Sequence, residues 1–247
     1  MTLTIDDCRA LEQEAFEYMP SNAMVHPETW GVASDHANYK LVWDALLARR
    51  IPRDAEFVFV EVGVDLGTFG AGLTERWPGM MLIGVDSYPT YHEDNNVVNT
   101  GFDEEGKRVA RADAMATALG HYAEGAEARG GRPCASLLHM TSVQAASLFV
   151  PNSVAVVWID ANHAQTSVAA DIRAWWPVVS TWVSGHDIDH EDNTLLANSA
   201  RGGAIEGGSV RRALADWDAE VGLTHDETDS RGGEFWWYDK LEGTEQQ

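Results

Sequence analysis

Short runs of apolar residues recur along the chain, and each run ends in a polar residue or a glycine. Such runs are typical of parallel strands that are buried on both faces of a sheet. They occupy residues 57–63, 80–86, 135–140, 154–160 and 182–187. Segments with helical spacing separate them, at residues 69–77, 105–128 and 165–176. This alternation predicts an open, doubly wound α/β sheet of the Rossmann-like type.

The two ends of the chain follow other patterns. Residues 1–50 have the apolar spacing of helices. A helical pattern at 209–219 precedes two strand-like runs, 221–227 and 234–240, which a glycine-containing turn joins. We therefore expect a mostly parallel seven-stranded sheet with a C-terminal antiparallel hairpin. The expected organisation is an N-terminal helical extension (1–54) and one main domain (55–247).

The charge of the chain restricts its partners. There are 39 Asp and Glu against 17 Lys and Arg, which gives a net charge of −22. So negative a protein repels nucleic acids and anionic membrane surfaces. Only two cysteines occur, the N-terminus has no secretion pattern, and no apolar run reaches the ~20 residues of a membrane span. We expect a cytoplasmic protein that acts on a small molecule, and self-association into a homo-oligomer stays open.

The turn after the first predicted strand carries a chemical pattern. Glu61 is followed by Gly63 and Gly67, and the next strand ends at Asp86, nineteen residues after Gly67. The glycine spacing differs from the Gly-x-Gly-x-x-Gly of dinucleotide sites, and no P-loop sequence is present. A carboxylate only accepts hydrogen bonds, so Asp86 suits two ribose hydroxyls. Alternatively, the glycines only permit a tight turn and Asp86 caps a helix.

The order of these residues resembles motif I of the class I S-adenosylmethionine-dependent methyltransferases, E/D-x-G-x-x-x-G. In that family the glycine loop wraps the methionine part of the cofactor, and the acid of the next strand binds the ribose. The resemblance therefore implies S-adenosyl-L-methionine as the cofactor. It also implies a set of cofactor-binding residues, with Ser142 near the adenine: Glu61, Gly63, Gly67, Asp86, Ser87, Ser142 and Asp160.

The second half of the chain resembles a methyltransferase subgroup that modifies small molecules and natural products, many of them at oxygen. The matching patterns are Ile-Asp-x-x-His at 159–163, Val-x-x-Asp-Ile-x-x-Trp at 168–175 and Gly-His-Asp at 185–187. The resemblance runs from about residue 55 to 240. Residues 180–182, Ser-Thr-Trp, depart from the Pro-Gly-Gly turn of this subgroup. We expect this departure to alter the strand entry rather than cofactor binding.

Acids and histidines follow two neighbouring predicted strands. Asp160 and His163 follow one strand, and His186, Asp187 and Asp189 follow the next. Because strand ends lie only ~4.8 Å apart, these groups can converge. In one interpretation Asp160, Asp187 and Asp189 bind Mg²⁺ or Mn²⁺, which activates an acceptor oxygen. In another, His163 or His186 is a metal-free general base, and in a third the cluster is structural.

Methyl transfer needs little covalent chemistry from a protein. The main requirement is in-line placement of the acceptor, the methyl carbon and the sulfur. We expect methyl transfer to the oxygen of a small molecule, metal-assisted or not, with catalytic roles for Asp160, His163, His186 and Asp187. Because fold does not determine function, two alternatives remain. They are a metal-assisted hydroxylase or hydrolase on the same scaffold, and a non-catalytic cofactor-binding module.

Overall fold

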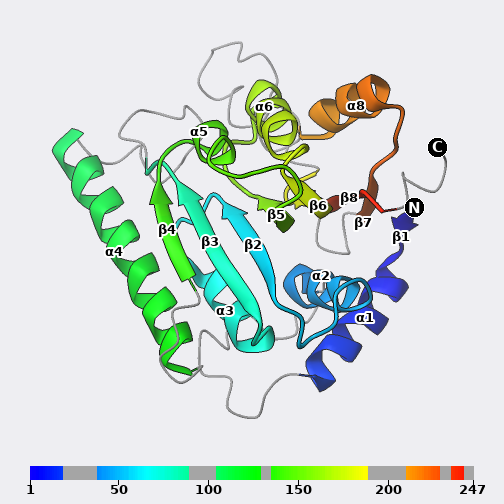
Figure 1. Ribbon diagram of the computed structural model, residues 1–247, viewed down its shortest axis with the longest axis horizontal. Helices are drawn as coiled ribbons and strands as arrows, with labels where there is room; N and C mark the ends of the chain where they lie inside the picture. The colour runs from blue at the N-terminus through cyan, green and yellow to red at the C-terminus, as the bar shows by residue number, and fades with distance from the viewer. Residues whose placement is uncertain (19–37, 89–103, 129–134, 189–209, 229–234, 242–247) are drawn as a thin grey trace.

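The computed structural model describes residues 1–18, 38–88, 104–128, 135–188, 210–228 and 235–241. Its strands form a single sheet (Figure 1). They are β1 (Thr2–Leu3), β2 (Phe57–Val62), β3 (Met80–Asp86), β4 (Ala135–His139), β5 (Val154–Ile159), β6 (Val179–Gly185), β7 (Asp226–Thr228) and β8 (Trp236–Asp239). Their order in the sheet is β1-β7-β8-β6-β5-β2-β3-β4.

The predicted Rossmann-like sheet is confirmed in its main part. Strands β4, β3, β2, β5 and β6 run parallel, and β8 is antiparallel to both β6 and β7, which confirms the C-terminal hairpin. The expected count of seven strands was wrong by one. Thr2–Leu3 adds an eighth strand by pairing in parallel with β7. Two residues are too few to produce a recognisable alternation, so the sequence pattern there indicated only helix.

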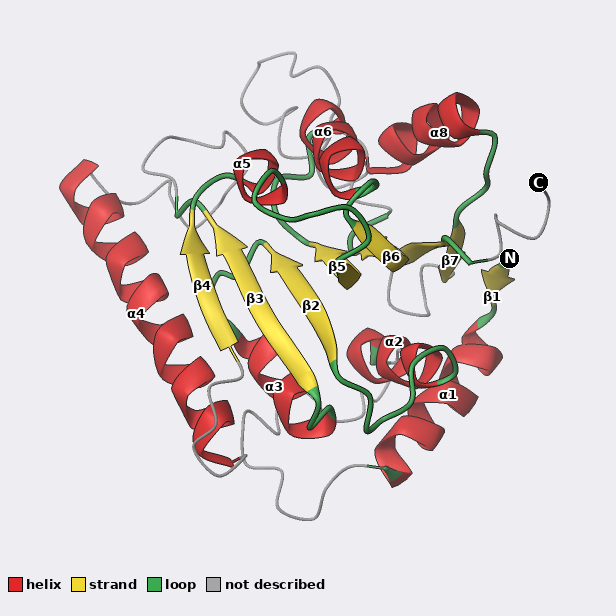
Figure 2. Cartoon of the chain, viewed as in Figure 1, coloured by secondary structure: helices red, strands yellow, loops and turns green. Residues whose placement is uncertain are grey.

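Helices cover both faces of this sheet (Figure 2). They are α1 (Ile5–Glu17), α2 (Tyr39–Ala48), α3 (Thr68–Arg76), α4 (Glu104–Ala128), α5 (Ser142–Ala146), α6 (Gln165–Trp175) and α8 (Val210–Val221). Helices α1 to α4 lie on one face, and α5, α6 and α8 lie on the other. The short helix α5, capped by Thr141, had no predicted counterpart. None of the described helices is long and apolar enough to cross a membrane.

Strand β2 shows why the apolar runs are nearly continuous. Successive side chains of a strand point to opposite faces of the sheet. Phe59 belongs to the core under α1 to α4, whereas Val60 and Val62 belong to the core under α5, α6 and α8. Glu61 shares its face with Phe59, so its carboxyl group points toward α3 and α4. Because both faces of β2 are buried, a polar residue such as Glu61 is unusual in this strand.

A buried ion network joins α2 to α3. Asp44 has no exposed surface, and it accepts hydrogen bonds from Arg53, Arg76 and the indole nitrogen of Trp77 at 2.6 to 3.0 Å. Burying a carboxylate is costly unless it is paired and hydrogen-bonded, and here both oxygens are. The network fixes α2 against the sheet, and α2 begins beside the cluster of acids and histidines described below.

Candidate functional site

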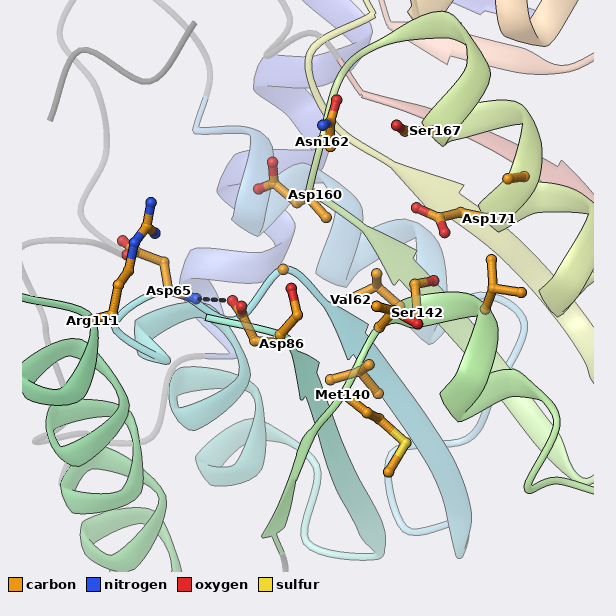
Figure 3. A pocket seen from close by; sticks show the side chains of 17 residues that line it. Val62, Asp65, Asp86, Arg111, Met140, Ser142, Asp160, Asn162, Ser167 and Asp171 are labelled. Carbon is orange, nitrogen blue, oxygen red and sulfur yellow. Dashed lines mark hydrogen bonds between the residues drawn. The ribbon is translucent and has the colours of Figure 1, made fainter. Parts of the chain in front are cut away.

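A cavity of about 360 Å³ opens at the carboxyl ends of β2, β3 and β5 (Figure 3). Its position follows from the topology. The chain passes from β2 to β3 and β4 on one side, and then returns to β5 on the other side of β2. Open α/β sheets bind their ligands at such a switch point. The volume lies in the range of cofactor and small-molecule sites.

The glycine turn forms one wall of this cavity. Gly63 lines it and has a φ of +88°, a left-handed conformation that favours glycine. A Cβ atom at this position would overlap the backbone carbonyl of Asp160. Gly67 has a φ of +73° and caps α3, but it does not line the cavity. The two predicted glycines therefore shape the turn, and of the two only Gly63 lies in the cavity wall.

Asp86 ties the end of β3 to the glycine turn. Its Oδ2 accepts hydrogen bonds from the backbone nitrogens of Val64 at 3.0 Å and Asp65 at 3.1 Å, and its Oδ1 accepts one from Tyr88 at 2.7 Å. A carboxylate has about four acceptor positions, so capacity for a ligand hydroxyl remains. Asp86, which the sequence predicted as the ribose-binding acid, and its neighbour Ser87, a predicted cofactor-binding residue, both line the cavity.

Glu61 lies behind the turn and does not line the cavity. It is 2% exposed, and its Oε2 accepts a hydrogen bond from the hydroxyl of Tyr122 at 2.9 Å. Burial raises the pKa of Glu61 to about 8, although the hydrogen bonds from Tyr122 and from the backbone of Gly70 oppose this rise. Because Glu61 is not part of the cavity wall, a cofactor in this cavity would not contact its side chain directly.

The opposite end of the cavity is formed by α5 and α6. Ser142, a predicted cofactor-binding residue, lines it and accepts a hydrogen bond from the indole nitrogen of Trp175 at 2.9 Å. Asp171 also lines it and is 6% exposed. Burial raises the pKa of Asp171 to about 6, although the interaction with Ser142 partly opposes this rise. Sequence reasoning did not select Asp171, although it is the acid of the Val-x-x-Asp pattern.

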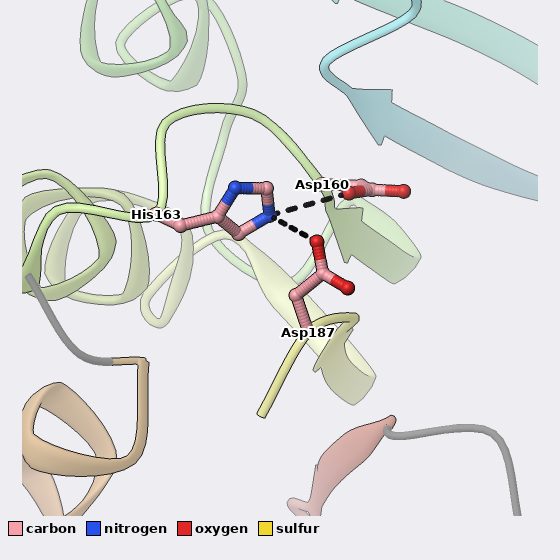
Figure 4. A group of neighbouring side chains, drawn as sticks. All are labelled: Asp160, His163 and Asp187. Carbon is pink, nitrogen blue, oxygen red and sulfur yellow. Dashed lines mark ion pairs between the residues drawn. The ribbon is translucent and has the colours of Figure 1, made fainter. Parts of the chain in front are cut away.

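Four of the predicted acids and histidines come together beside the cavity, and Figure 4 shows three of them, Asp160, His163 and Asp187. His163 Nε2 lies 3.4 Å from Asp160 Oδ1 and 3.3 Å from Asp187 Oδ2. His186 Nδ1 lies 3.0 Å from Asp187 Oδ1 and 4.0 Å from Asp160 Oδ2. Asp160 also lines the cavity, so the cluster and the cavity share a wall. Asp189, the third predicted metal ligand, lies outside the described residues.

The cluster is suited to positive charge. Burial alone would lower the pKa of His163, but the hydrogen bond to Asp160 and the charges of Asp187 and Asp160 outweigh it and raise this pKa. Asp160, His163 and Asp187 each offer one ligand atom, and these three atoms lie within 4.8 Å of one another. Two carboxylate oxygens and an imidazole nitrogen are a donor set for Mn²⁺ or a similar ion rather than for Mg²⁺, which prefers oxygen alone.

Tyr39 is a site residue that sequence reasoning missed. It is the first residue of α2, and its ring stacks on His186 with centroids 4.2 Å apart. Trp158 also stacks with His186, at 6.2 Å. Burial, and then the charges of Asp160 and Asp187, raise the pKa of the Tyr39 phenol. No local pattern marks this role, because it depends on contact between residues far apart in the chain.

Comparison with known proteins identifies the family. A family model described as a methyltransferase domain matches residues 60–188, just over half of the 247 residues. Among solved structures, the cofactor-bound protein Rv0187 from MTB has a TM-score of 0.51 at 14% identity, over 94% of this chain and 87% of that one. A protein from Corynebacterium glutamicum has a TM-score of 0.48 at 14% identity, over 94% and 89%. A calicheamicin methyltransferase has a TM-score of 0.43 at 14% identity, over 79% and 84%.

The matched segment contains the cavity and the cluster of acids and histidines, although not Tyr39. It runs from β2 to the end of β6 and includes the glycine turn, Asp86, Ser142 and the whole cluster around Asp160. No curated protein sequence matches the chain. The likeness to Rv0187 supports the fold alone, because the identity is low. The family match carries the assignment: this chain belongs to the family of methyltransferase domains and is an S-adenosylmethionine-dependent methyltransferase.

Proposed function

We propose that this methyltransferase transfers the methyl group to an oxygen atom of a small molecule beside Asp160, His163 and Asp187. One observation carries the proposal: Asp160 belongs both to the wall of the cavity and to the cluster. The bound cofactor supplies a methyl group on a positively charged sulfonium. The remaining task of the protein is to hold an acceptor oxygen in line with that methyl group.

The lining of the cavity fits the cofactor. Gly63 lies in the wall of the cavity, where a Cβ atom would collide with the backbone of Asp160. Asp86 would accept hydrogen bonds from the ribose hydroxyls, with Ser87 next to it, and Ser142 would lie near the adenine. Glu61 and Gly67 would act indirectly, by supporting the turn. The negative charges of Asp86 and Asp160 favour a cationic ligand.

We further propose that the cluster holds a divalent cation. Asp160, His163 and Asp187 would be its ligands, and Asp189 remains a predicted fourth ligand. Their two oxygens and one nitrogen lie close enough together to converge on one ion, and this donor set favours Mn²⁺ over Mg²⁺. Such an ion, when bound, lowers the pKa of an acceptor hydroxyl. In a metal-free reaction, His163 would take the hydroxyl proton instead.

His186 would be the base of the metal-assisted reaction. Stacking against Tyr39 and Trp158 restricts the plane of its ring, and Asp187 orients its Nδ1 atom. A carboxylate paired with an imidazole favours the protonated ring, which helps the ring to accept a proton. Tyr39 is then a positioning residue.

Calorimetry with S-adenosylhomocysteine tests the cofactor site. We expect binding by the unmodified protein and a loss of about 10- to 100-fold in affinity for Asp86→Ala, because one charge-assisted hydrogen-bonding partner contributes roughly 1.5–3 kcal/mol. Asp54→Ala removes an equal charge from an exposed position and should leave the affinity unchanged. The absence of binding at high micromolar concentration would contradict the cofactor assignment of the cavity.

A radiolabelled cofactor tests the acceptor. The label should pass to hydroxyl compounds in a panel of phenols, catechols, sugars and amines, and transfer to amines alone would contradict the proposal.

The same assay tests the cation site. Manganese should raise the rate of methyl transfer, and a chelator should lower it. Asp187→Asn should abolish this response, with Asp113→Asn as the exposed control. A rate that the chelator and Asp187→Asn both leave unchanged would refute the cation site.

A further inference from the structure

The sheet face that carries α5, α6 and α8 is covered unevenly. Helix α6 packs over β5 and β6, whereas β3 meets the five-residue helix α5 on this side. Strand β4 packs against α4, which lies on the opposite face. Figure 1 shows that no described helix lies in front of the amino-terminal halves of β2, β3 and β4. This part of the sheet is therefore left open by the described helices.

The open part of the sheet is apolar. Side chains alternate between the two faces of a strand, and both neighbours of Met81 in β3 belong to the core on the other face, so Met81 points to this one. Its side chain is 53% exposed. The register partner of Met81 in β2 is the half-buried Val58. Ile83, two positions along the same face, is paired with Ser136 of β4, so these four side chains form one surface across three strands.

The segment that follows α5 enlarges this surface. It runs from α5, which packs on β3, to the start of β5, and β2 lies between these two strands in the sheet. Phe149 packs inward against Trp175, whereas Leu148 and Val150 on either side of it are 63% and 68% exposed. Contiguous exposed apolar patches mark interaction surfaces. We refer to this surface as the open patch, and none of its members is charged: Val58, Met81, Ile83, Ser136, Leu148 and Val150.

We propose that a second copy of this chain covers the open patch, so that the protein forms a symmetric dimer. The charge of the chain favours this occupant. At a net charge of −22, two copies repel each other wherever their acids meet. In a two-fold contact the same patch meets itself, so an acidic patch would repel its copy, whereas an uncharged apolar patch is complementary to itself. A basic partner would be attracted to the acidic surface instead, and an uncharged patch offers it no such attraction.

The proposed contact lies away from the reacting groups. Met81 is the second residue of β3, and Asp86, which lines the cavity, is the last. The open patch is thus centred on the amino-terminal half of the sheet, whereas the cavity and the cluster lie at the carboxyl ends of the strands. Dimer formation needs neither the cofactor nor an acceptor, so a failure of this inference would leave the proposed function unaffected.

Sedimentation velocity of the full chain measures its self-association at protein concentrations from about 1 to about 100 µM. We expect a dimer that becomes more stable as salt is added, because salt screens the repulsion between two copies of charge −22. Met81→Glu places an acid on both sides of the contact and should raise the dissociation constant of the dimer at least about tenfold, as should Leu148→Glu. Leu119→Glu is the matched control. Leu119 is 47% exposed on α4, on the other face of the sheet, and its replacement should leave the dissociation constant within about threefold.

Three results would overturn the inference. They are an unmodified protein that stays monomeric at the highest concentration in high salt, a dimer that salt weakens, and a dimer that Met81→Glu and Leu148→Glu both leave intact. Thermal melting of each variant checks its folding. If Met81→Glu does not fold, Leu148→Glu carries the test, because Leu148 lies outside the strands. Hydrogen exchange of the unmodified protein adds a second measurement: exchange in residues 147–153 should slow as the protein concentration rises, and a rate independent of concentration would contradict the proposed contact.

Discussion

Replacing Glu61 by glutamine should stabilise the protein more and more as the pH rises. Glu61 is 2% exposed, and its pKa is about 8 in the folded protein against an ordinary 4.5. Between these two pH values the unfolded chain releases a proton that the folded protein keeps. The unfolded state thus binds fewer protons there, so the free energy of unfolding falls as the pH rises. Glutamine keeps an oxygen that can accept from Tyr122 and has no proton to lose.

The size of this effect follows from the two pKa values. At about 1.4 kcal/mol for each tenfold change in proton affinity, the interval from 4.5 to about 8 sets a ceiling of roughly 5 kcal/mol. Since part of the effect is already present at pH 5, we expect the stability of Glu61→Gln relative to the unmodified protein to increase by about 2–4 kcal/mol between pH 5 and 8.5. Other titrating groups, including Asp171, are present in both proteins and cancel in the difference.

Urea unfolding followed by tryptophan fluorescence measures this difference at each pH. Glu56→Gln, an exposed change next to the same strand, is the matched control and, as a surface substitution, should change the stability by no more than about 0.5 kcal/mol. If the difference for Glu61→Gln also stays constant within about 0.5 kcal/mol, Glu61 ionises normally and the reasoning from its burial is refuted.

Four further substitutions test the packing. Gly63→Ala forces a Cβ atom into the backbone of Asp160 and should destabilise the protein by more than about 2 kcal/mol. Gly120→Ala, in an open part of α4, should stabilise the protein by up to about 1 kcal/mol. Thermal melting of the two variants compares these effects. Asp44→Asn removes the charge that pairs with the buried Arg76 and should cost about 3–5 kcal/mol in urea unfolding. Arg173→Ala removes an ion pair that is about half exposed and should cost less than about 1 kcal/mol; a larger loss would contradict this ranking.

Much of the fold could be predicted from local patterns. The apolar runs from 57–63 to 182–187 became five parallel strands, and the burial of β2, β5 and β6 on both faces explains the local signature of these three in the sequence. Gly63, Asp86, Ser142 and Asp160 were selected because ligands bind at the carboxyl ends of such strands, and all four line the cavity. The strand β1 and the helix α5 were not foreseen, since two and five residues are too short to show a period.

Other features depended on contacts between distant parts of the chain. The direction of the Glu61 side chain was settled by the alternation of β2 between two buried faces, and this direction removed it from the cavity. Tyr39 reaches His186 only because α2 packs across the sheet. Asp171 faces the cavity because α6 lies next to α5. The periodic elements, and the end of the sheet where chemistry occurs, could be predicted from the sequence because both follow from local burial. Tertiary structure decided which side chains meet there, because those contacts join residues tens to hundreds of positions apart.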